Sequence, residues 1–136
     1  MIKIREIYHD DLDLLKGLVK ELQQSTQWRH DLDSINFDSM LEEMGSLPSI
    51  YSNIIAMEGR KAAGFLSMIC YKTFLNRGGT ALITVLIVSG KYRRKGVGSM
   101  LIEKAVEIAK QIGMDELEVG TASKPRSCKL RSVCAA

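Results

Sequence analysis

Residues 85–99 read Val85-Leu86-Ile87-Val88-Ser89-Gly90-Lys91-Tyr92-Arg93-Arg94-Lys95-Gly96-Val97-Gly98-Ser99. The run starts as an apolar strand, continues as a loop with four cations in five positions, and ends where a helical pattern begins. Gly96 and Gly98 allow positive φ and a close approach of backbone to a ligand, so successive N–H groups can converge on a phosphate. The positive end of the helix points at the same place. The run therefore predicts a phosphate-binding loop, which we call the cationic loop (residues 89–96).

The charges of the cationic loop conflict with the helix that follows it. Each cation beside a helix N-terminus opposes the helix dipole by about 0.3–1 kcal/mol. A bound polyanion would relieve that conflict, whereas a turn with a purely structural role would leave it in place. The structural turn stays open as an alternative, because glycine pairs also occur wherever a strand turns sharply into a helix.

The segment Arg93-Arg94-Lys95-Gly96-Val97-Gly98 resembles the acetyl-coenzyme A signature R/Q-x-x-G-x-G/A of the GNAT superfamily of N-acetyltransferases. The elements before it also fall in the family's order, so the resemblance spans residues 1–123. It implies an α/β fold with a mixed central sheet and helices on both faces, the acyl-CoA N-acyltransferase architecture. It also implies an acetyl-CoA-dependent N-acetyltransferase whose acceptor, a primary amine of a small molecule or peptide, attacks the thioester directly.

The same resemblance implies which residues bind the cosubstrate acetyl-CoA. Backbone groups of the strand would pair with the pantetheine arm, and an N–H near Leu86 or Ile87 would face the thioester oxygen. Backbone N–H groups from Arg94 to Ser99 would hold the pyrophosphate, with Arg93 or Arg94 adding a charge-assisted contact. The expected binding residues are Leu86, Ile87, Val88, Arg93, Arg94, Lys95, Gly96, Val97, Gly98 and Ser99.

The acid and base of the reaction are where the chain departs from the family pattern. Family members often place a carboxylate on the strand before the loop, but this chain has Thr84 and Val85 there. The usual acid, a tyrosine after the next strand, is missing because no tyrosine follows Tyr92. Candidate bases on the acceptor side are Glu43, Asp38 and His30, each of which also reads as a solvated surface residue. A coenzyme A-binding module with weak or no activity is therefore the alternative function.

A dinucleotide-binding fingerprint, G-x-G-x-x-G after a strand, is the other alternative. Gly96 and Gly98 match its first two glycines, and Glu116 and Glu118 lie near the distance of its acidic residue. Leu101 stands in place of the third glycine, however, and such a loop does not need four cations before it.

Hydrophobic periodicity predicts the remaining elements. We expect strands at 2–8, 50–57, 62–74, 80–88 and 116–120, and helices at 10–24, 37–44 and 98–112. Residues 58–61 form the turn of a hairpin, with Gly59 in it. The continuous apolar character of 80–88 predicts that both faces of that strand are buried. Cys70 reads as an apolar core residue.

Charge divides the chain into two halves. Residues 1–58 carry five Lys and Arg against eleven Asp and Glu, and residues 59–136 carry fourteen against five. An acidic acceptor side favours a cationic substrate, although these acids also fit helix caps and solvated faces. The cations gather at one loop and in the tail with little aromatic interleaving, so we expect no nucleic-acid partner.

Length and composition predict one domain at residues 1–123, with a basic, atypical tail at 124–136. No apolar run is long enough to cross a membrane and no signal peptide begins the chain, so we expect a cytoplasmic protein. Three cysteines without a C-x-x-C pair argue against a metal site and a disulfide framework.

The end of the chain departs from the family, which continues past the strand at 116–120 with another helix and two more strands. We expect a C-terminally shortened fold in which the strand at 116–120 has an unpaired edge. An unpaired edge is a template for association, so we expect a homodimer or a swapped arrangement that covers it.

Overall fold

The computed structural model describes residues 1–25, 34–75, 77–119 and 126–129. Its elements are β1 (Ile2–Glu6), η1 (His9–Asp11), α1 (Leu12–Ser25), α2 (Phe37–Gly45), β2 (Tyr51–Glu58), β3 (Lys61–Tyr71), β4 (Thr80–Val88), η3 (Gly90–Tyr92), α3 (Val97–Ile112), β5 (Glu116–Val119) and β6 (Arg126–Lys129). None of the described helices is long and apolar enough to cross a membrane.

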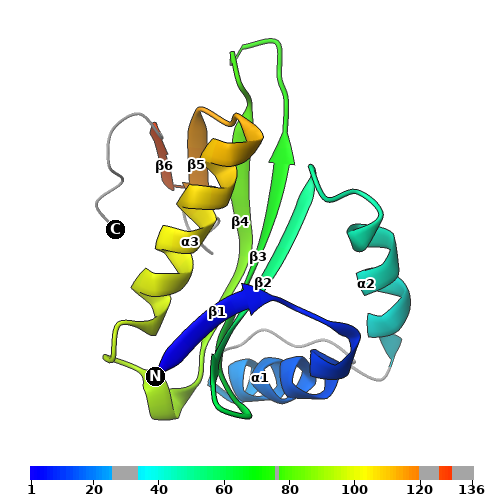
Figure 1. Ribbon diagram of the computed structural model, residues 1–136, viewed down its shortest axis with the longest axis vertical. Coiled ribbons are helices and arrows are strands. Elements are labelled where there is room, and N and C mark those ends of the chain that lie inside the picture. Colours follow the sequence, from blue (N-terminus) through cyan, green and yellow to red (C-terminus); the bar gives the residue numbers. More distant parts are fainter. Residues whose placement is uncertain (26–33, 76, 120–125, 130–136) are drawn as a thin grey trace.

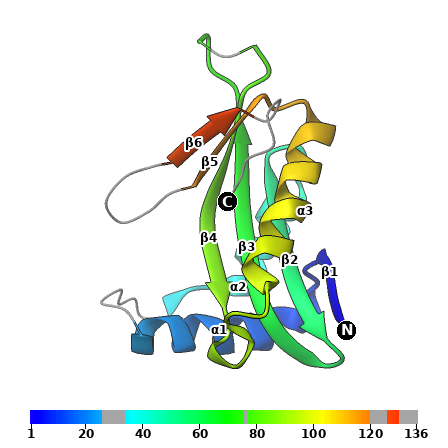
Figure 2. The same cartoon turned by 90° about the vertical axis from the view of Figure 1, so that its left-hand side faces the viewer.

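The six strands form one sheet in the order β1-β2-β3-β4-β5-β6. Neighbouring strands are antiparallel except β4 and β5, which are parallel. Helices α1 and α2 lie on one face of the sheet and α3 on the other (Figures 1 and 2). Each face has its own core, one under α1 and one under α3. The predicted mixed sheet with helices on both faces is confirmed.

β4 and α3 agree closely with the elements predicted from the sequence pattern. β4 has the predicted bounds, and α3 starts one residue before the predicted position. The buried side of α3 consists of Val97, Leu101, Ala105 and Ala109. These residues recur at helical spacing, which is why the pattern was visible in the sequence.

The prediction that both faces of β4 are buried is wrong in the middle of the strand. Thr84 is exposed and Val85 and Leu86 are half-buried. The register changes from Met68 opposite Ile83 to Ser67 opposite Val85, so Thr84 is the extra residue of a β-bulge. In addition, β5 pairs with β4 only as far as Ile83, which leaves one side of the following residues without a neighbouring strand among the described residues.

Gly64 on β3 sets how closely α3 approaches the sheet. A Cβ at this position would lie 2.7 Å from the carbonyl oxygen of Ile87, 3.0 Å from Leu101 Cδ1 and 3.2 Å from Val97 Cγ1. The first distance is shorter than side-chain carbons tolerate, and a backbone oxygen cannot rotate away. Gly64 therefore lets the first turns of α3 pack directly against β3 and β4, which brings the helix N-terminus beside the end of β4 (Figure 2).

β6 corrects our expectation for the end of the chain. Its four residues pair antiparallel with all four residues of β5, from Glu116 opposite Lys129 to Val119 opposite Arg126. The predicted unpaired edge of β5 is therefore wrong, and this edge no longer supports the expected homodimer, which stays a prediction. A short polar segment shows no periodicity, yet its backbone can complete a ladder because those hydrogen bonds do not depend on side-chain type.

Several element ends differ from the sequence pattern. The strand predicted at 62–74 ends at Tyr71, and Phe74 and Leu75 lie exposed in the connection to β4. The helix predicted from residue 10 begins as the short η1 before α1. Cys70 is 4% exposed, as expected for a core residue, and burial raises the pKa of its thiol.

Asp11 ties β1 to the start of α1. Its buried carboxylate accepts two hydrogen bonds from the Arg5 guanidinium, at 2.6 and 2.9 Å, and one from the Tyr8 N–H at 2.8 Å. The Arg5 hydrogen bonds, above all, hold the pKa of Asp11 below its ordinary value. A carboxyl group with a lowered pKa stabilises the fold above its unfolded-state pKa of about 3.9, and this stabilisation is lost as pH falls through the folded-state pKa.

We expect Asp11→Asn to lower the free energy of unfolding at pH 7 by about 1.5–3 kcal/mol, because a charge-assisted pair is lost. The difference from the wild-type protein should shrink below about pH 4, where Asp11 becomes protonated in the unfolded state before it does in the folded state. Urea unfolding at pH 7 and at pH 3 measures both. Asp13→Asn is the control, since Asp13 is exposed in the first turn of α1 and should cost less than about 1 kcal/mol. Equal losses for the two variants at pH 7 would contradict this role of Asp11.

Candidate active site

The cationic loop joins β4 to α3 through two left-handed residues. Arg94 has φ 63° and Gly96 has φ 80°. Gly96 is the N-cap of α3, where no side chain caps the helix and the first turn contains no acidic residue. The first intrahelical bond of α3 runs from the Met100 N–H to the Gly96 carbonyl. The N–H groups at the start of α3 thus point out of an uncapped helix end into a loop with exposed cations.

Arg94 is the one non-glycine residue with positive φ in the described part of the chain. The left-handed conformation costs an ordinary L-residue about 1–2 kcal/mol. Its side chain is exposed, so no packing inside the protein requires arginine there. Backbone strain of this kind is concentrated at ligand-binding sites.

Tyr92 anchors the cationic loop in the core under α3. The residue is 8% exposed and belongs to the core under α3. Its hydroxyl donates a hydrogen bond of 3.2 Å to Glu58 on β2, and the Lys95 ammonium lies 5.6 Å from the centre of its ring. Burial, assisted by the Glu58 carboxylate, raises the pKa of Tyr92, so the hydroxyl remains protonated. This role was not predicted from the sequence, although an aromatic residue among cations was an available signal.

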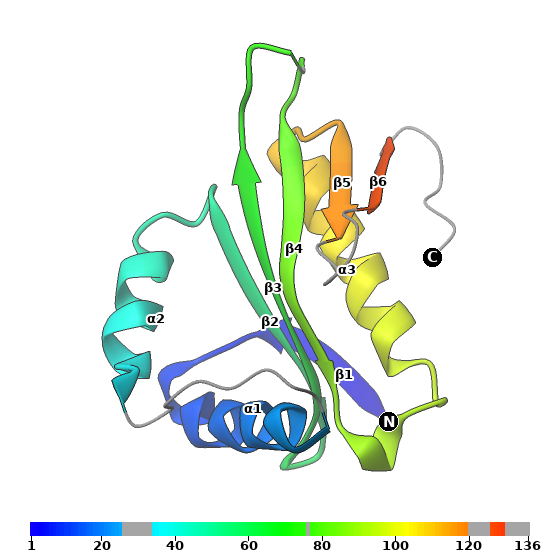
Figure 3. The same ribbon diagram turned by 180° about the vertical axis from the view of Figure 1, so that it is seen from behind.

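The second half of β4 presents backbone groups to a side on which the described residues place no neighbouring strand, and we call this the open side of β4. The Ser89 N–H donates to the Ala63 carbonyl on β3 at 2.9 Å. Because an antiparallel ladder alternates, Ile87 and Val85 also point their N–H groups toward β3, and Leu86 and Val88 point theirs away. β5 has already ended beside Ile83, and Figure 3 shows β4 running on past it toward η3. The Leu86 N–H therefore points to the open side of β4 and the Ile87 N–H points to β3, a difference that the sequence could not show.

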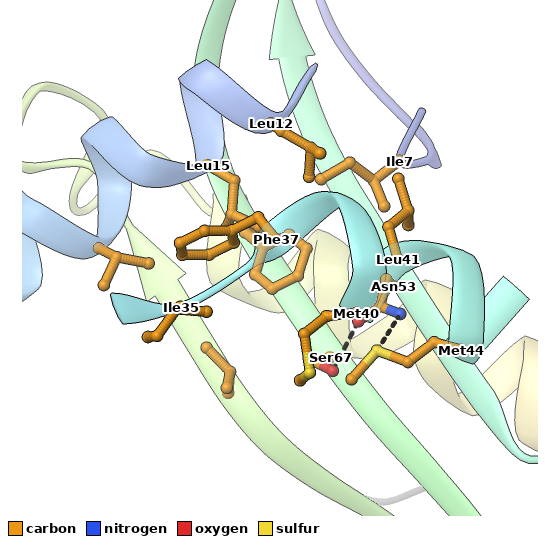
Figure 4. Close-up of a pocket in the computed structure, with 13 residues that line it drawn as sticks. Ile7, Leu12, Leu15, Ile35, Phe37, Met40, Leu41, Met44, Asn53 and Ser67 are labelled. Carbon is orange, nitrogen blue, oxygen red and sulfur yellow. Dashed lines mark hydrogen bonds between the residues drawn. The ribbon is translucent and has the colours of Figure 1, made fainter. Parts of the chain in front are cut away.

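An apolar pocket of about 210 Å³ lies between α1, α2 and the sheet. Apolar side chains form most of its wall; examples are Leu15, Phe37, Met40, Met44, Phe65 and Val85. Its lining includes two polar side chains, Asn53 and Ser67 (Figure 4). The Ser67 hydroxyl donates to Asn53 Oδ1 at 2.7 Å, and Asn53 Nδ2 donates to Met44 Sδ at 3.3 Å. Val85 lines the pocket and Leu86 follows it, so the pocket adjoins the open side of β4.

The candidate bases are not brought to this pocket. Asp38 lies 2.9 Å from His9 Nδ1, where both side chains are largely exposed. Glu43 is exposed on α2. Neither lines the pocket, and His30 lies outside the described residues. Thr84, at the position expected for a carboxylate, donates its hydroxyl to the Ser67 carbonyl at 3.3 Å. Among the residues that the structure describes, no carboxylate lines the pocket.

Asn53 and Ser67 were missed in the sequence, where each is followed by apolar strand residues. That placement was the available signal, because a polar residue at a core-facing position needs a hydrogen-bonding partner. The ten residues expected to bind acetyl-CoA do come together, since they occupy the second half of β4, the cationic loop and the first turn of α3. No group of three His, Cys, Asp or Glu side chains suited to a metal ion occurs in the described part of the chain.

The model of the Acetyltransferase (GNAT) family matches residues 6–130. The chain belongs to this family. The match includes both helices over one face of the sheet, the cationic loop and all of β5 and β6. The protein is therefore an acetyltransferase, and the dinucleotide-binding alternative is wrong. The predominantly antiparallel sheet agrees, because a dinucleotide-binding fold needs a parallel one.

Solved structures show the same fold. Glucosamine-6-phosphate N-acetyltransferase from Arabidopsis thaliana is 24% identical with a TM-score of 0.76, over 90% of this chain and 84% of the other. An aminoglycoside acetyltransferase from an uncultured soil metagenomic sample, in complex with sisomicin, is 20% identical with a TM-score of 0.72, over 90% and 78%. AAC(6′)-Iy in complex with the bisubstrate analogue CoA-S-monomethyl-acetylneamine is 21% identical with a TM-score of 0.69, over 91% and 82%. No curated protein matches the chain significantly in sequence.

Proposed function

We propose that this GNAT protein transfers the acetyl group of acetyl-CoA to the primary amine of a small molecule or peptide. The observation that carries the proposal is the continuity of three features. The open side of β4 leads into the cationic loop, and the cationic loop leads into the uncapped N-terminus of α3. Acetyl-CoA has an extended pantetheine arm that ends in phosphates. The arm could pair with the open strand edge while the phosphates bind the helix N-terminus.

The phosphate end of acetyl-CoA fits the cationic loop and the start of α3. N–H groups from Arg94 to Ser99 would donate to the pyrophosphate, and the side chains of Arg93, Arg94 or Lys95 would add charge-assisted contacts. Gly98 supports this use. A Cβ there would make only an ordinary contact of 3.5 Å with Val88 Cγ2, so packing inside the protein does not require glycine. A ligand that approaches the helix backbone closely would require it.

The pantetheine arm would pair with the outward backbone groups of Leu86 and Val88. This pairing would place the thioester carbonyl near the Leu86 N–H, which would stabilise the charge that develops on its oxygen. The neutral acceptor amine attacks the carbonyl carbon from the pocket side. A C–N bond forms, the C–S bond breaks, and the proton lost by the amine ends on the sulfur of coenzyme A.

Two of the structural relatives support an amine acceptor and a coenzyme A donor for this chain. One carries glucosamine 6-phosphate in its name, and another is in complex with an analogue that joins coenzyme A to an acetylated amine. The alternative is a protein that binds acetyl-CoA without turnover. The absence of a carboxylate from the described lining of the pocket favours that alternative.

Calorimetric titration of acetyl-CoA, with NAD as the control ligand, tests the proposal. We expect saturable binding of acetyl-CoA and none of NAD. Release of free thiol from acetyl-CoA in the presence of primary amines then separates the two functions: amine-dependent release indicates the transferase, and binding without release indicates the binding module. Failure to bind acetyl-CoA would overturn both.

Arg94→Gly should separate binding from stability. Loss of one charge-assisted contact is expected to weaken acetyl-CoA binding about tenfold or more. Stability should stay the same or rise by up to about 1 kcal/mol, because glycine adopts φ 63° without strain but has a more flexible unfolded chain. Calorimetry and thermal unfolding measure the two effects.

Arg94→Lys is the matched control for this change. It retains both the positive charge, which suffices for a single contact to phosphate, and the strained backbone, so acetyl-CoA affinity should stay within about threefold of the wild type and the melting temperature should not change. If Arg94→Gly left the affinity intact, the arginine would have no part in phosphate binding.

A further inference from the structure

We infer that the acceptor is an amine carried on a compact apolar group, and that this group occupies the pocket between α1, α2 and the sheet. The inference rests on the proposed function, because it concerns the second substrate of the same reaction. It replaces our expectation of a cationic acceptor, which rested on the acidic composition of residues 1–58. It also separates this protein from relatives named for an amino sugar phosphate or seen with an aminoglycoside.

The position of the pocket marks it as the place of the acceptor. Val85 contributes to its wall, and the next residue, Leu86, presents its N–H on the open side of β4. A molecule in the pocket therefore lies one residue along the strand from the expected thioester. The cationic loop is on the far side of Leu86, at the end of β4.

The chemistry of the wall selects against charged and sugar-like acceptors. No described lining side chain is charged, and Asn53 and Ser67 supply its few polar atoms. None of the acids described in residues 1–25 and 34–58 belongs to the lining; for example, Asp11 is bound to Arg5, Asp38 is beside His9, and Glu43 is exposed. A sugar or a polyamine would leave its hydroxyl or ammonium groups without partners in such a pocket, which is costly.

The size of the pocket sets the size of the group. A dry cavity of about 150 Å³ accepts benzene. The observed 210 Å³ therefore suits a phenyl ring with a short alkyl chain, or a branched alkyl group. Met40 and Met44 both line the pocket, and methionine side chains adapt readily to the shape of an apolar ligand.

The Ser67–Asn53 pair gives the pocket one polar spot. The Ser67 proton is used in the 2.7 Å hydrogen bond to Asn53, so the Ser67 oxygen keeps its lone pairs for another donor. An amine N–H is such a donor. Apolar surroundings also disfavour the ammonium form of the amine, and only the neutral form can attack the thioester. The pocket thus favours the neutral amine, a task for which the described lining offers no carboxylate base.

Comparison of three acceptors tests the inference: 2-phenylethylamine, glucosamine 6-phosphate and spermidine, each at fixed saturating acetyl-CoA. We expect kcat/KM for 2-phenylethylamine to exceed that of the other two by at least about tenfold. In the series propylamine, butylamine and pentylamine, each added methylene should raise kcat/KM up to about fourfold while it remains in the pocket. Higher kcat/KM for the sugar phosphate or the polyamine would overturn the inference.

Variants of the pocket give a second readout. Met40→Trp should fill part of the volume and weaken 2-phenylethylamine, by calorimetric binding and by kcat/KM, about tenfold. Met40→Leu, of similar volume, should change both less than threefold. Ser67→Ala should lower kcat/KM about fivefold, and Ser39→Ala, on the exposed side of α2, should not. Acetyl-CoA affinity should be unchanged in all four.

The outcomes distinguish the two proposals. If acetyl-CoA binds but the Met40→Trp variant handles 2-phenylethylamine like the wild type, the pocket is not the acceptor site and the inference fails alone. If acetyl-CoA does not bind the wild-type protein, the proposed function fails and the inference fails with it.

Discussion

Gly98→Asp abolishes acetyl-CoA binding and leaves the fold intact: this is the expected result of the most informative change at the start of α3. A carboxylate in the first turn of α3 would stand where the pyrophosphate is expected and would repel it. Loss of two or more charge-assisted bonds, at about 1.5–3 kcal/mol each, predicts a dissociation constant raised on the order of 100-fold or more.

The stability of the Gly98→Asp variant should be equal to or higher than that of the wild-type protein, although its affinity for acetyl-CoA falls. A Cβ at position 98 meets only Val88 Cγ2, at the ordinary distance of 3.5 Å, and Gly98 does not have positive φ. A negative charge at a helix N-terminus stabilises the helix by about 0.3–1 kcal/mol. Thermal unfolding should therefore show an unchanged or higher melting temperature while calorimetry shows no binding.

Gly98→Asn is the matched control, since asparagine has the shape of aspartate without the charge. We expect it to bind acetyl-CoA more weakly than the wild type but clearly more tightly than Gly98→Asp. Undiminished binding by the aspartate variant would show that the phosphates lie elsewhere. Equal loss in both variants would assign the effect to crowding instead of charge.

Gly64→Val should destabilise the protein strongly, by more than the loss of the Arg5–Asp11 pair. Even a Cβ would lie 2.7 Å from the Ile87 carbonyl oxygen, and the two further carbons of valine would press on Leu101 and Val97. Overpacking typically costs about 1–3 kcal/mol for a small increase in volume, so valine should cost about 3 kcal/mol or more of a total near 5–15 kcal/mol. Urea unfolding measures the loss.

Gly17→Ala provides the opposite expectation for the same kind of substitution. Gly17 is exposed inside α1 with no atom within 4 Å of an added Cβ. Alanine there should stabilise the helix by about 0.5–1 kcal/mol.

A Gly64→Val protein as stable as the wild type would mean that α3 can move away from β3. In that event acetyl-CoA binding should fall, because the N-terminus of α3 would leave the end of β4.

The cationic loop and the helix after it were predictable because their signals lie close together in the chain. Gly96 takes the positive φ that glycine permits, and Gly113 ends α3 in the same conformation. The apolar spacing of α3 and the unbroken apolar run of β4 identified the elements on either side. Each of these signals depends on backbone preferences and periodicity within a few residues.

The pairing of strands was less predictable. The bulge at Thr84 changes which residues of β4 point their backbone N–H groups toward β3. Because β5 ends beside Ile83, the backbone groups of Leu86 and Val88 point to the open side of β4. The polar segment Arg126–Lys129 completed the sheet although it shows no strand pattern. Both outcomes depend on backbone hydrogen bonds between distant segments, which leave little trace in side-chain type.

By itself, the sequence determined the class of this protein, the order of its elements and the chemistry of the cationic loop, because those depend on neighbours in the chain. The tertiary structure alone decided which backbone groups of β4 are open, and that Asn53 and Ser67 meet inside an apolar pocket. The lining of that pocket runs from Ile7 to Val85 and comes from several elements. Residues so far apart share a site only after the sheet and its helices have packed, so the lining of this pocket could not be predicted from composition.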